Sequence, residues 1–168
     1  MSGLERHEVP DDVDGDEWRL RITGAVERSV ELSERDLEAY AMETFTSDFD
    51  CIAGWTAAGL SWRGVRVGTL LDRATPTADC RYALVRAADG EYACSFPLDR
   101  LRSAVLAVEL DGERLPLEHG GPARLVPTAT DADCWESIKW VEGIELHRSE
   151  PAASDTAKAT ALSRIDAQ

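Results

Sequence analysis

YALVRAADGEYACSFPL, residues 82–98, is the stretch that decides the fold. Two β-prone apolar runs flank a central Asp89-Gly90 pair. Because an Asp-Gly pair between such runs is the strongest short-range signal for a β-hairpin, the stretch predicts two antiparallel strands. A second Asp-Gly pair stands at 111–112, directly after the apolar run VLAVEL. The middle of the chain is therefore expected to be rich in β-structure.

The segments before this hairpin predict short strands and short helices. Residues 17–24, EWRLRITG, alternate apolar and charged side chains, which predicts a half-buried strand ending at Gly24. Residues 27–32 predict a second strand. Ser33 is expected to be the N-cap of a helix over ERDLEAYA, whose first turn is acidic, as the helix dipole favours.

The next two segments complete the first half of the chain. TFTSDFDCIAGW, residues 44–55, is β-branched and aromatic, so it predicts a buried strand that delivers Cys51 to a turn at Gly54. LSWRGVRVGTLLDRA, residues 60–74, predicts a turn that leads into an amphipathic helix near residues 67–74.

The second half continues in short elements. LDRLRSA predicts a short helix, the 111–112 turn leads into a loop that contains His119, and PARLVP predicts a short strand. SIKWVEGIEL, residues 137–146, predicts a final pair of strands. Residues 1–15 are expected to be an acidic arm and residues 149–168 a polar tail, so the predicted domain spans residues 16–148. The fold class is α+β and β-rich, with mixed sheets and short helices.

The composition limits the classes of partner. The chain has 168 residues, which suits one domain. Its formal net charge is −14, with 32 acidic and 18 basic residues, so a nucleic-acid backbone would be repelled. Lys139 and Lys158 are the only lysines. Such a surface is typical of a salt-loving organism, with an acidic protein from a high-GC genome as the alternative.

The cysteines and the N-terminus indicate a reducing compartment. Four cysteines stand at 51, 80, 94 and 134 without a CxxC pair, and the three histidines form no HxxxH arrangement. A conventional zinc site or a disulfide scaffold is therefore not expected. The N-terminus has no export signal, and the chain contains no apolar run long enough to span a bilayer. The expected location is the cytoplasm.

Six motifs occur together in a specific order: WRLRITGAV, FDCIAGW, SWRGVRVGTLL, DGEYACSFPL, VLAVELDGERLPLEHGGPARLVP and SIKWVEGIEL. In this order and spacing they resemble the oxidoreductase molybdopterin-binding domain of the sulfite oxidase family, from about residue 17 to 147. The resemblance implies a mainly β fold that holds one molybdenum-molybdopterin cofactor, with tungsten as the alternative metal. It also implies two-electron oxygen-atom transfer on a small substrate.

Cys51 matches the family's metal-ligating and catalytic cysteine. The chemistry agrees, because a thiophilic metal takes a deprotonated thiolate, and a strand followed by a tight turn would hold that ligand rigidly. The alternative for Cys51 is a small buried apolar residue, which is the commonest role of a free cysteine. Cys80, Cys94 and Cys134 match no ligand position and are expected to be packing residues.

The resemblance assigns further cofactor contacts to the C-terminal motifs. HGGPAR places His119 and Arg124 where the family holds the pterin and its phosphate, and Lys139 follows in SIKWV. An arginine fork suits phosphate oxygens and a lysine adds a point charge. Ser137 and Ile138 would contribute backbone contacts. Alternatively, Arg124 and Lys139 pair with nearby carboxylates.

Other motif residues have a less specific match. Asp89 and Tyr92 correspond to residues beside the metal pocket, for pterin contact and pocket lining; the alternatives are a hairpin tip and a cross-strand aromatic. Arg6 and His7 stand where larger relatives have an Arg-Asn-His segment, although the asparagine is missing here. Separately, Trp55 and Trp62 are expected in the core or the pocket wall. Trp18, Trp135 and Trp140 are expected in the core, with covering of the pterin as the alternative for Trp135.

Two departures from the family pattern bear on function. No arginine follows Cys51 until Arg63, whereas sulfite oxidases carry sulfite-binding arginines there, so sulfite is in doubt as the substrate. The loop PTATDADCWE, residues 127–136, is acidic and would weaken cofactor binding unless its acids point outward. Any redox partner must be a separate chain. The alternatives to an enzyme are a cofactor-free β-rich binding module and a cofactor carrier.

Overall fold

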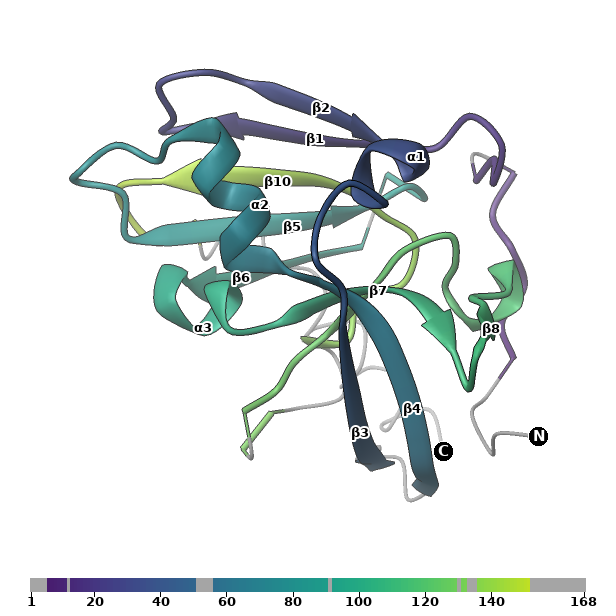
Figure 1. The fold of residues 1–168 in the computed structure, drawn as a ribbon. Coiled ribbons are helices and arrows are strands. Elements are labelled where there is room, and N and C mark those ends of the chain that lie inside the picture. Colours follow the sequence, from purple (N-terminus) through teal and green to yellow (C-terminus); the bar gives the residue numbers. More distant parts are fainter. Residues whose placement is uncertain are drawn as a thin grey trace.

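The structure is a computed structural model that describes residues 6–11, 13–50, 56–90, 92–129, 131–132 and 136–151, without the side chains of 47–50 and 56–58. These residues form two five-stranded sheets and a few short helices (Figure 1). The β-rich α+β architecture predicted from the sequence is confirmed.

The first sheet has the strand order β2-β1-β10-β5-β6. β1 and β10 run parallel, and the other neighbouring strands of this sheet are antiparallel, so the sheet is mixed. Strand β10 therefore joins an N-terminal hairpin to a central one. The strands are β1 (Arg19–Gly24), β2 (Val30–Ser33), β5 (Tyr82–Ala87), β6 (Ala93–Pro97) and β10 (Val141–His147).

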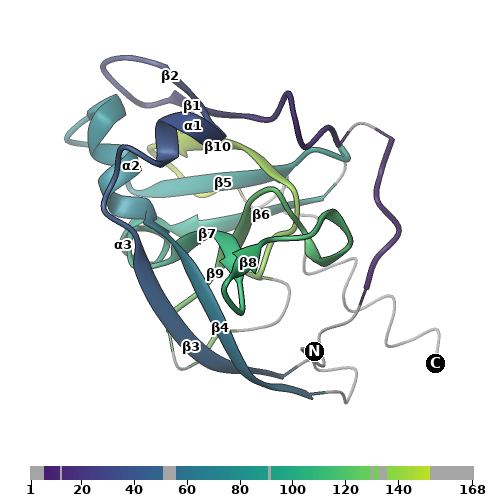
Figure 2. The same cartoon turned by 45° about the vertical axis from the view of Figure 1, so that its right-hand side comes forward.

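The second sheet has the order β3-β4-β7-β8, and β9 pairs with β7. All these pairs are antiparallel. Strands β3 and β4 reach away from the other elements in both ribbon views (Figures 1 and 2). The strands are β3 (Glu43–Asp50), β4 (Thr56–Arg66), β7 (Val105–Leu110), β8 (Glu113–Arg114) and β9 (Arg124–Val126).

Short helices close the apolar core. Helix α2 (Val67–Ala74) lies over one face of the first sheet (Figure 1) and buries Leu70 and Leu71 completely. Leu20, Ile22 and Ile144 of the sheet belong to the same apolar cluster, so burial of this face stabilises the helix. The other helices are α1 (Glu34–Leu37), α3 (Leu98–Arg102) and the 3₁₀ turn η1 (Leu117–His119).

Several local predictions are confirmed. The first strand ends at Gly24, the hairpin forms at 82–97, and α2 spans the predicted residues 67–74. Ser33 caps α1 through a capping box, in which its hydroxyl accepts from the Asp36 amide and the Asp36 carboxylate accepts from the Ser33 amide. That helix is shorter than predicted, because Ala39 and Tyr40 donate to acceptors three residues back.

The predicted buried strand at 44–55 is wrong in its burial. Its described part, β3, is an edge strand that pairs with β4. Thr44 and Thr46 are exposed, and Phe45 between them is half-buried against a small apolar cluster. The threonines thus face solvent, and the strand alternates as a half-buried strand does.

The turn predicted in LSWRG is also wrong, because these residues belong to the strand β4. Gly64 suggested a turn, yet it serves a close approach between strands. A Cβ at Gly64 would lie 2.0 Å from the carbonyl oxygen of Leu106 on β7. The glycine is therefore required by the neighbouring backbone, as glycines within strands often are.

The final pair of strands is a single strand, β10, which starts at Val141. Trp140 has φ +53°, a left-handed conformation that ends extended structure before this strand. The second predicted strand, at 27–32, is shifted and begins at Val30. Residues Glu27 and Arg28 instead donate to the end of α2 and the residue after it.

Candidate cofactor-binding site

Two segments distant in the sequence run side by side and bring most of the predicted site residues together. The amide of Trp140 donates to the Gly120 carbonyl at 2.9 Å, and that of Val141 donates to Ala123 at 3.0 Å. The Leu125 amide donates in turn to the carbonyl of Ile138 at 2.9 Å. His119, Arg124, Ser137 and Lys139, which we call the basic cluster, are positioned by this backbone ladder.

Arg124 is the buried centre of the basic cluster, with 2% of its surface exposed. Its Nε donates to the Ser137 hydroxyl at 2.9 Å and its Nη1 to the His119 carbonyl at 3.0 Å. These two acceptors fix the orientation of the guanidinium within the cluster. The guanidinium carbon also lies 5.5 Å from the ring centre of Trp62, within cation–π range.

Lys139 lies between two aromatic rings. Its ammonium is 5.8 Å from the ring centre of Tyr92 and 5.7 Å from that of Trp140. Tyr92 follows the tip of the β5–β6 hairpin, and this tip is tied to the cluster because Ala88 donates to the Trp140 carbonyl at 2.7 Å. Tyr92 and Lys139, both predicted as site residues, therefore lie close together.

Gly120 makes room for both cations. It has φ +97°, and a Cβ there would lie 2.8 Å from Cγ of Lys139 and 3.1 Å from Cδ of Arg124. A larger residue would strain the backbone and displace the neighbouring side chains. The glycine of HGGPAR therefore shapes the basic cluster directly.

Trp140 is held in its left-handed conformation by several hydrogen bonds and one ring contact. Besides its backbone bonds to Gly120 and Ala88, its indole Nε1 donates to the Leu117 carbonyl at 2.8 Å. The His7 ring packs edge-on against the indole, with ring centres 6.4 Å apart. Strain at a bulky residue persists only where the surroundings fix it, and such positions gather at functional sites.

The N-terminal arm also reaches this region. The amide of His7 donates to the Glu118 carbonyl at 2.8 Å, beside the start of HGGPAR. His7, which with Arg6 stands where larger relatives have an Arg-Asn-His segment, thus lies near the basic cluster. Asp89 has a structural part at the hairpin tip, where its carboxylate accepts from the Tyr92 amide at 2.9 Å.

Cys51 lies outside the described residues, as do Trp55, Cys134 and Trp135. Cys80 and Cys94 are free and buried, which confirms their packing role. Burial raises the pKa of the Cys80 thiol, so it stays protonated and unreactive at neutral pH. Within the described ranges, no three His, Cys, Asp or Glu side chains are grouped to hold a metal ion.

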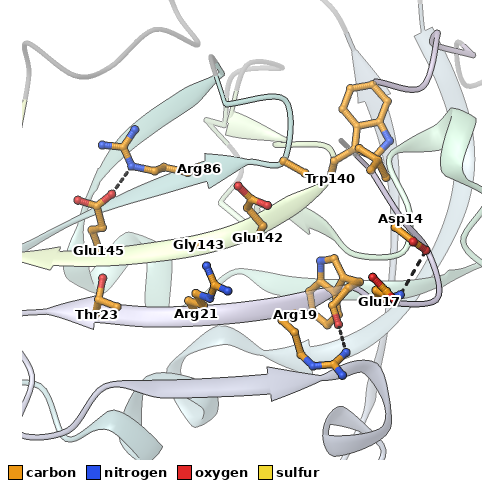
Figure 3. A pocket seen from close by; sticks show the side chains of 13 residues that line it. Asp14, Glu17, Arg19, Arg21, Thr23, Arg86, Trp140, Glu142, Gly143 and Glu145 are labelled. Atoms are coloured by element: carbon orange, nitrogen blue, oxygen red, sulfur yellow. Dashed lines mark hydrogen bonds and ion pairs between the residues drawn. The ribbon is translucent and has the colours of Figure 1, made fainter. Parts of the chain in front are cut away.

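A groove of about 420 Å³ runs along the outer face of the first sheet (Figure 3). Its walls carry Arg19, Arg21 and Arg86 together with acidic side chains. Arg21 pairs with Glu31 and Arg86 with Glu145, so these charges are matched at the surface. Trp140 and Ala88 line the groove and also belong to the surroundings of the basic cluster.

Sequence reasoning missed three features of the site. Trp62 was predicted as core or pocket wall, and its contact with Arg124 was not foreseen. Among the described residues its buried indole Nε1 has no hydrogen-bond partner. The aromatic walls of Lys139 and the pairing of Arg100 with Glu136 were also missed. The contacts of Trp62 with Arg124, of Tyr92 with Lys139 and of Arg100 with Glu136 join residues far apart in the chain, which no local pattern reveals.

Comparisons with known proteins agree on one family. The family model described as "Oxidoreductase molybdopterin binding domain" matches residues 6–154. The chain is 31% identical over 145 residues to the "Uncharacterized oxidoreductase YuiH" of Bacillus subtilis, covering 85% of this chain and 72% of that protein. It is 31% identical over 157 residues to the "Nitrate reductase [NADPH]" of Fusarium oxysporum, covering 77% of this chain but 17% of that enzyme.

The fold agrees with a solved structure. The sulfane dehydrogenase SoxCD from Paracoccus pantotrophus superposes with a TM-score of 0.77 at 24% identity, over 83% of this chain and 40% of that one. The mixed-sheet architecture is thus the sulfite-oxidase-type fold. No helix among the described residues is long and apolar enough to cross a membrane.

Proposed function

The chain belongs to the oxidoreductase molybdopterin-binding domain family, and from this premise we propose that it binds one molybdenum-molybdopterin and catalyses two-electron oxygen-atom transfer on a small substrate. The observation that carries the proposal is the buried guanidinium of Arg124, oriented by Ser137 and flanked in the cluster by Lys139. Two cations fixed at one place suit an anionic ligand such as the phosphate of the pterin.

The residues present fit that cofactor. The basic cluster offers charge for a phosphate, and Gly120 lets Lys139 and Arg124 approach each other, because a Cβ there would lie 2.8 Å from Cγ of Lys139. The unpartnered indole N–H of Trp62, beside Arg124, is a buried donor that an electron-rich ligand would satisfy. Buried donors around a fixed cation are what a pterin, with its many acceptor atoms, requires.

Each proposed site residue has its own part. Arg124 and Lys139 hold the phosphate end, His119 and Ser137 orient Arg124, and Tyr92 lines the pocket. Asp89 supports Tyr92 through the hairpin tip and is proposed to contact the pterin. Cys51 provides the thiolate for the metal; this rests on its motif, FDCIAGW. When bound, the cofactor supplies the redox chemistry, and the protein supplies position and electrostatics.

The substrate remains a proposal of class only. Relatives named for nitrate and a relative with no named substrate share this domain, so the family does not fix the substrate. The absence of an arginine between Cys51 and Arg63 argues against sulfite. We propose a small substrate whose recognition does not depend on arginines directly after the metal ligand.

The domain limits and surroundings are proposals too. We propose a domain over 16–148, a separate redox partner protein and a cytoplasmic location. A salt-rich cytoplasm would suit the net charge of −14, because salt screens the self-repulsion of a dense carboxylate surface. The chain spans 17% of the fungal nitrate reductase, so that enzyme's other activities are not transferred.

Metal and pterin analysis of the purified protein tests the proposal. Wild type, Cys51→Ser and the control Cys80→Ser would be purified from a host that makes the cofactor, and molybdenum, tungsten and released pterin counted per folded chain. We expect near-stoichiometric metal and pterin in wild type and Cys80→Ser, and loss of metal in Cys51→Ser. Cys80 is a suitable control because its buried thiol lies in the core.

The rival functions give different results. A cofactor-free binding module would be folded, without metal or pterin, and indifferent to Cys51→Ser. Such a result in wild type would overturn the enzyme proposal. A cofactor carrier would contain pterin and pass it to another protein without turning over any oxygen-atom donor or acceptor.

A further inference from the structure

Arg100 of α3 forms a bidentate ion pair with Glu136. Its Nε lies 2.5 Å from one carboxylate oxygen of Glu136, and its Nη2 lies 3.0 Å from the other. Its Nη1 also donates to Asp131 at 3.1 Å. The Glu136 side chain is 8% exposed and that of Arg100 27%, so this pair is much less hydrated than the other arginine–carboxylate pairs of the described residues.

This pair lies directly beside the basic cluster. Glu136 immediately precedes Ser137, whose hydroxyl accepts from Nε of Arg124. The carbonyl of Glu136 also accepts from the Ile138 amide at 3.1 Å. The side chain that Arg100 holds is therefore next to the turn that presents Ser137 and Lys139.

The charge of Glu136 would otherwise oppose the proposed ligand. A buried carboxylate one residue from Ser137 repels an anion across a poorly screened interior. A guanidinium fork that matches both carboxylate oxygens cancels this charge and fixes the carboxylate in one orientation. The contact with Glu136 also raises the pKa of Arg100, so the cation persists at every accessible pH.

We infer that Arg100 is a positioning residue for the cofactor site: it neutralises Glu136 and holds the 136–139 segment so that Ser137, Arg124 and Lys139 can receive an anionic pterin phosphate. This inference rests on the proposed function. In the described part of the acidic 127–136 loop, the Asp131 side chain is 80% exposed and that of Glu136 is buried, and both pair with Arg100.

Pterin retention tests the inference separately from activity. Wild type, Arg100→Ala, Glu136→Gln, the double variant and Arg102→Ala would be passed through gel filtration, and pterin per folded chain measured by the fluorescence of its oxidised form. Arg102 is the matched control: it lies on the same helix and pairs with Asp72 at 2.8 Å, at an exposed position.

We expect Arg100→Ala to lose about tenfold in retained pterin, as supporting contacts of a cofactor site do. The double variant, which no longer carries the unpaired acid, should recover to within about threefold of wild type. Glu136→Gln and Arg102→Ala should stay near wild type. Recovery in the double variant shows that the unpaired carboxylate of Glu136, and not the lost packing of the arginine side chain, causes the loss of pterin. Because pterin is counted per folded chain, unfolded protein does not enter the comparison.

The following results would overturn the inference. Arg100→Ala could retain as much pterin as Arg102→Ala, or the double variant could lose as much as the single one. If Arg100→Ala does not fold, Glu136→Gln decides, and a tenfold loss there contradicts the neutralising role. If wild type itself contains no pterin, the proposed function fails and this inference falls with it, which distinguishes the two failures.

Discussion

The basic cluster and the outer groove use arginine in opposite ways. Arg124 is buried, and its described acceptors are a hydroxyl and a carbonyl. Arg86, on the groove wall, has a side chain 44% exposed and pairs with Glu145 (Figure 3). One guanidinium is oriented by neutral groups in the interior, and the other is matched by a carboxylate at the surface.

The difference between Arg124 and Arg86 indicates which arginines can bind an anionic ligand. An exposed, paired arginine is already solvated and neutralised, so little is gained when an anion approaches it. A buried arginine whose orientation is fixed lies in a medium of low polarity, where its attraction for an anion is less screened than at the surface. The groove is lined by arginines that are already paired with carboxylates, so we expect the basic cluster to be the better anion site.

The sharpest test of this contrast is to remove each arginine in turn. In cofactor-free protein, Arg124→Ala should lower the free energy of unfolding by about 2–3 kcal/mol, because it breaks buried hydrogen bonds and leaves a cavity. Arg86→Ala should change it by less than about 0.5 kcal/mol. Urea unfolding followed by circular dichroism measures both. Equal changes in the free energy of unfolding for Arg124→Ala and Arg86→Ala would contradict the distinction between the basic cluster and the outer groove.

A second test uses two glycines with similar backbones and different surroundings. Gly120 and Gly90 have φ +97° and +76°, and no heavy atom of the described part lies within 4 Å of a Cβ built at Gly90. Gly90→Ala should cost about 1 kcal/mol for the left-handed backbone alone. Gly120→Ala should cost about 2 kcal/mol, because the new Cβ also meets Lys139.

The same pair of variants can be scored on cofactor content. Gly120→Ala should retain less pterin than Gly90→Ala, since it displaces Lys139 and Arg124. If both alanines cost the same in unfolding and in pterin, the tight packing at Gly120 has no part in shaping the cluster.

The smallest expected effect is the pH dependence of an exposed pair. Arg66 donates to both carboxylate oxygens of Glu43 at 2.9 Å, and this contact lowers the pKa of Glu43 below its ordinary value of 4.5. Stability from the pair is thus fully present above pH 4.5 and is lost as the pH falls through the lower folded-state pKa. Because both side chains are largely exposed, the gain is below about 1 kcal/mol.

Comparing wild type with Glu43→Gln checks this sign. The wild type should be slightly more stable in urea at pH ~7, and the two should converge at pH ~3. A difference that grows on acidification would show that exposed pairs in this protein do not follow the rule applied to the outer groove.

The elements that were predicted correctly are those whose sequence signals lie within the element itself. The hairpin at 82–97 depends on Asp89-Gly90, α1 begins at a Ser33 capping box, and α2 has an apolar stripe. β4 was not predicted because a glycine such as Gly64 usually indicates a turn. The close approach of the Leu106 backbone, which requires this glycine within a strand, is not visible in the sequence. The break before β10 was missed because no local rule predicts a left-handed tryptophan at Trp140.

The contacts of the site also fall into those that the sequence predicts locally and those that depend on the whole fold. The spacing in HGGPAR predicted that His119 and Arg124 act together, and the fold brings them together. The ion pair of Arg100 with Glu136 joins a helix to a distant loop, and the contact of Trp62 with Arg124 crosses between strands. Such contacts depend on the register of whole sheets, which composition and spacing do not specify.

The parallel pairing of β1 with β10 sets the order of events during synthesis. Arg21 aligns with Gly143, so the first sheet stays as two unconnected hairpins until nearly all of the described chain has left the ribosome. Such non-local closure is slow. The 136–141 segment that completes the basic cluster arrives together with β10. A nascent chain therefore has no finished place for the cofactor, and loading must follow release of the whole domain.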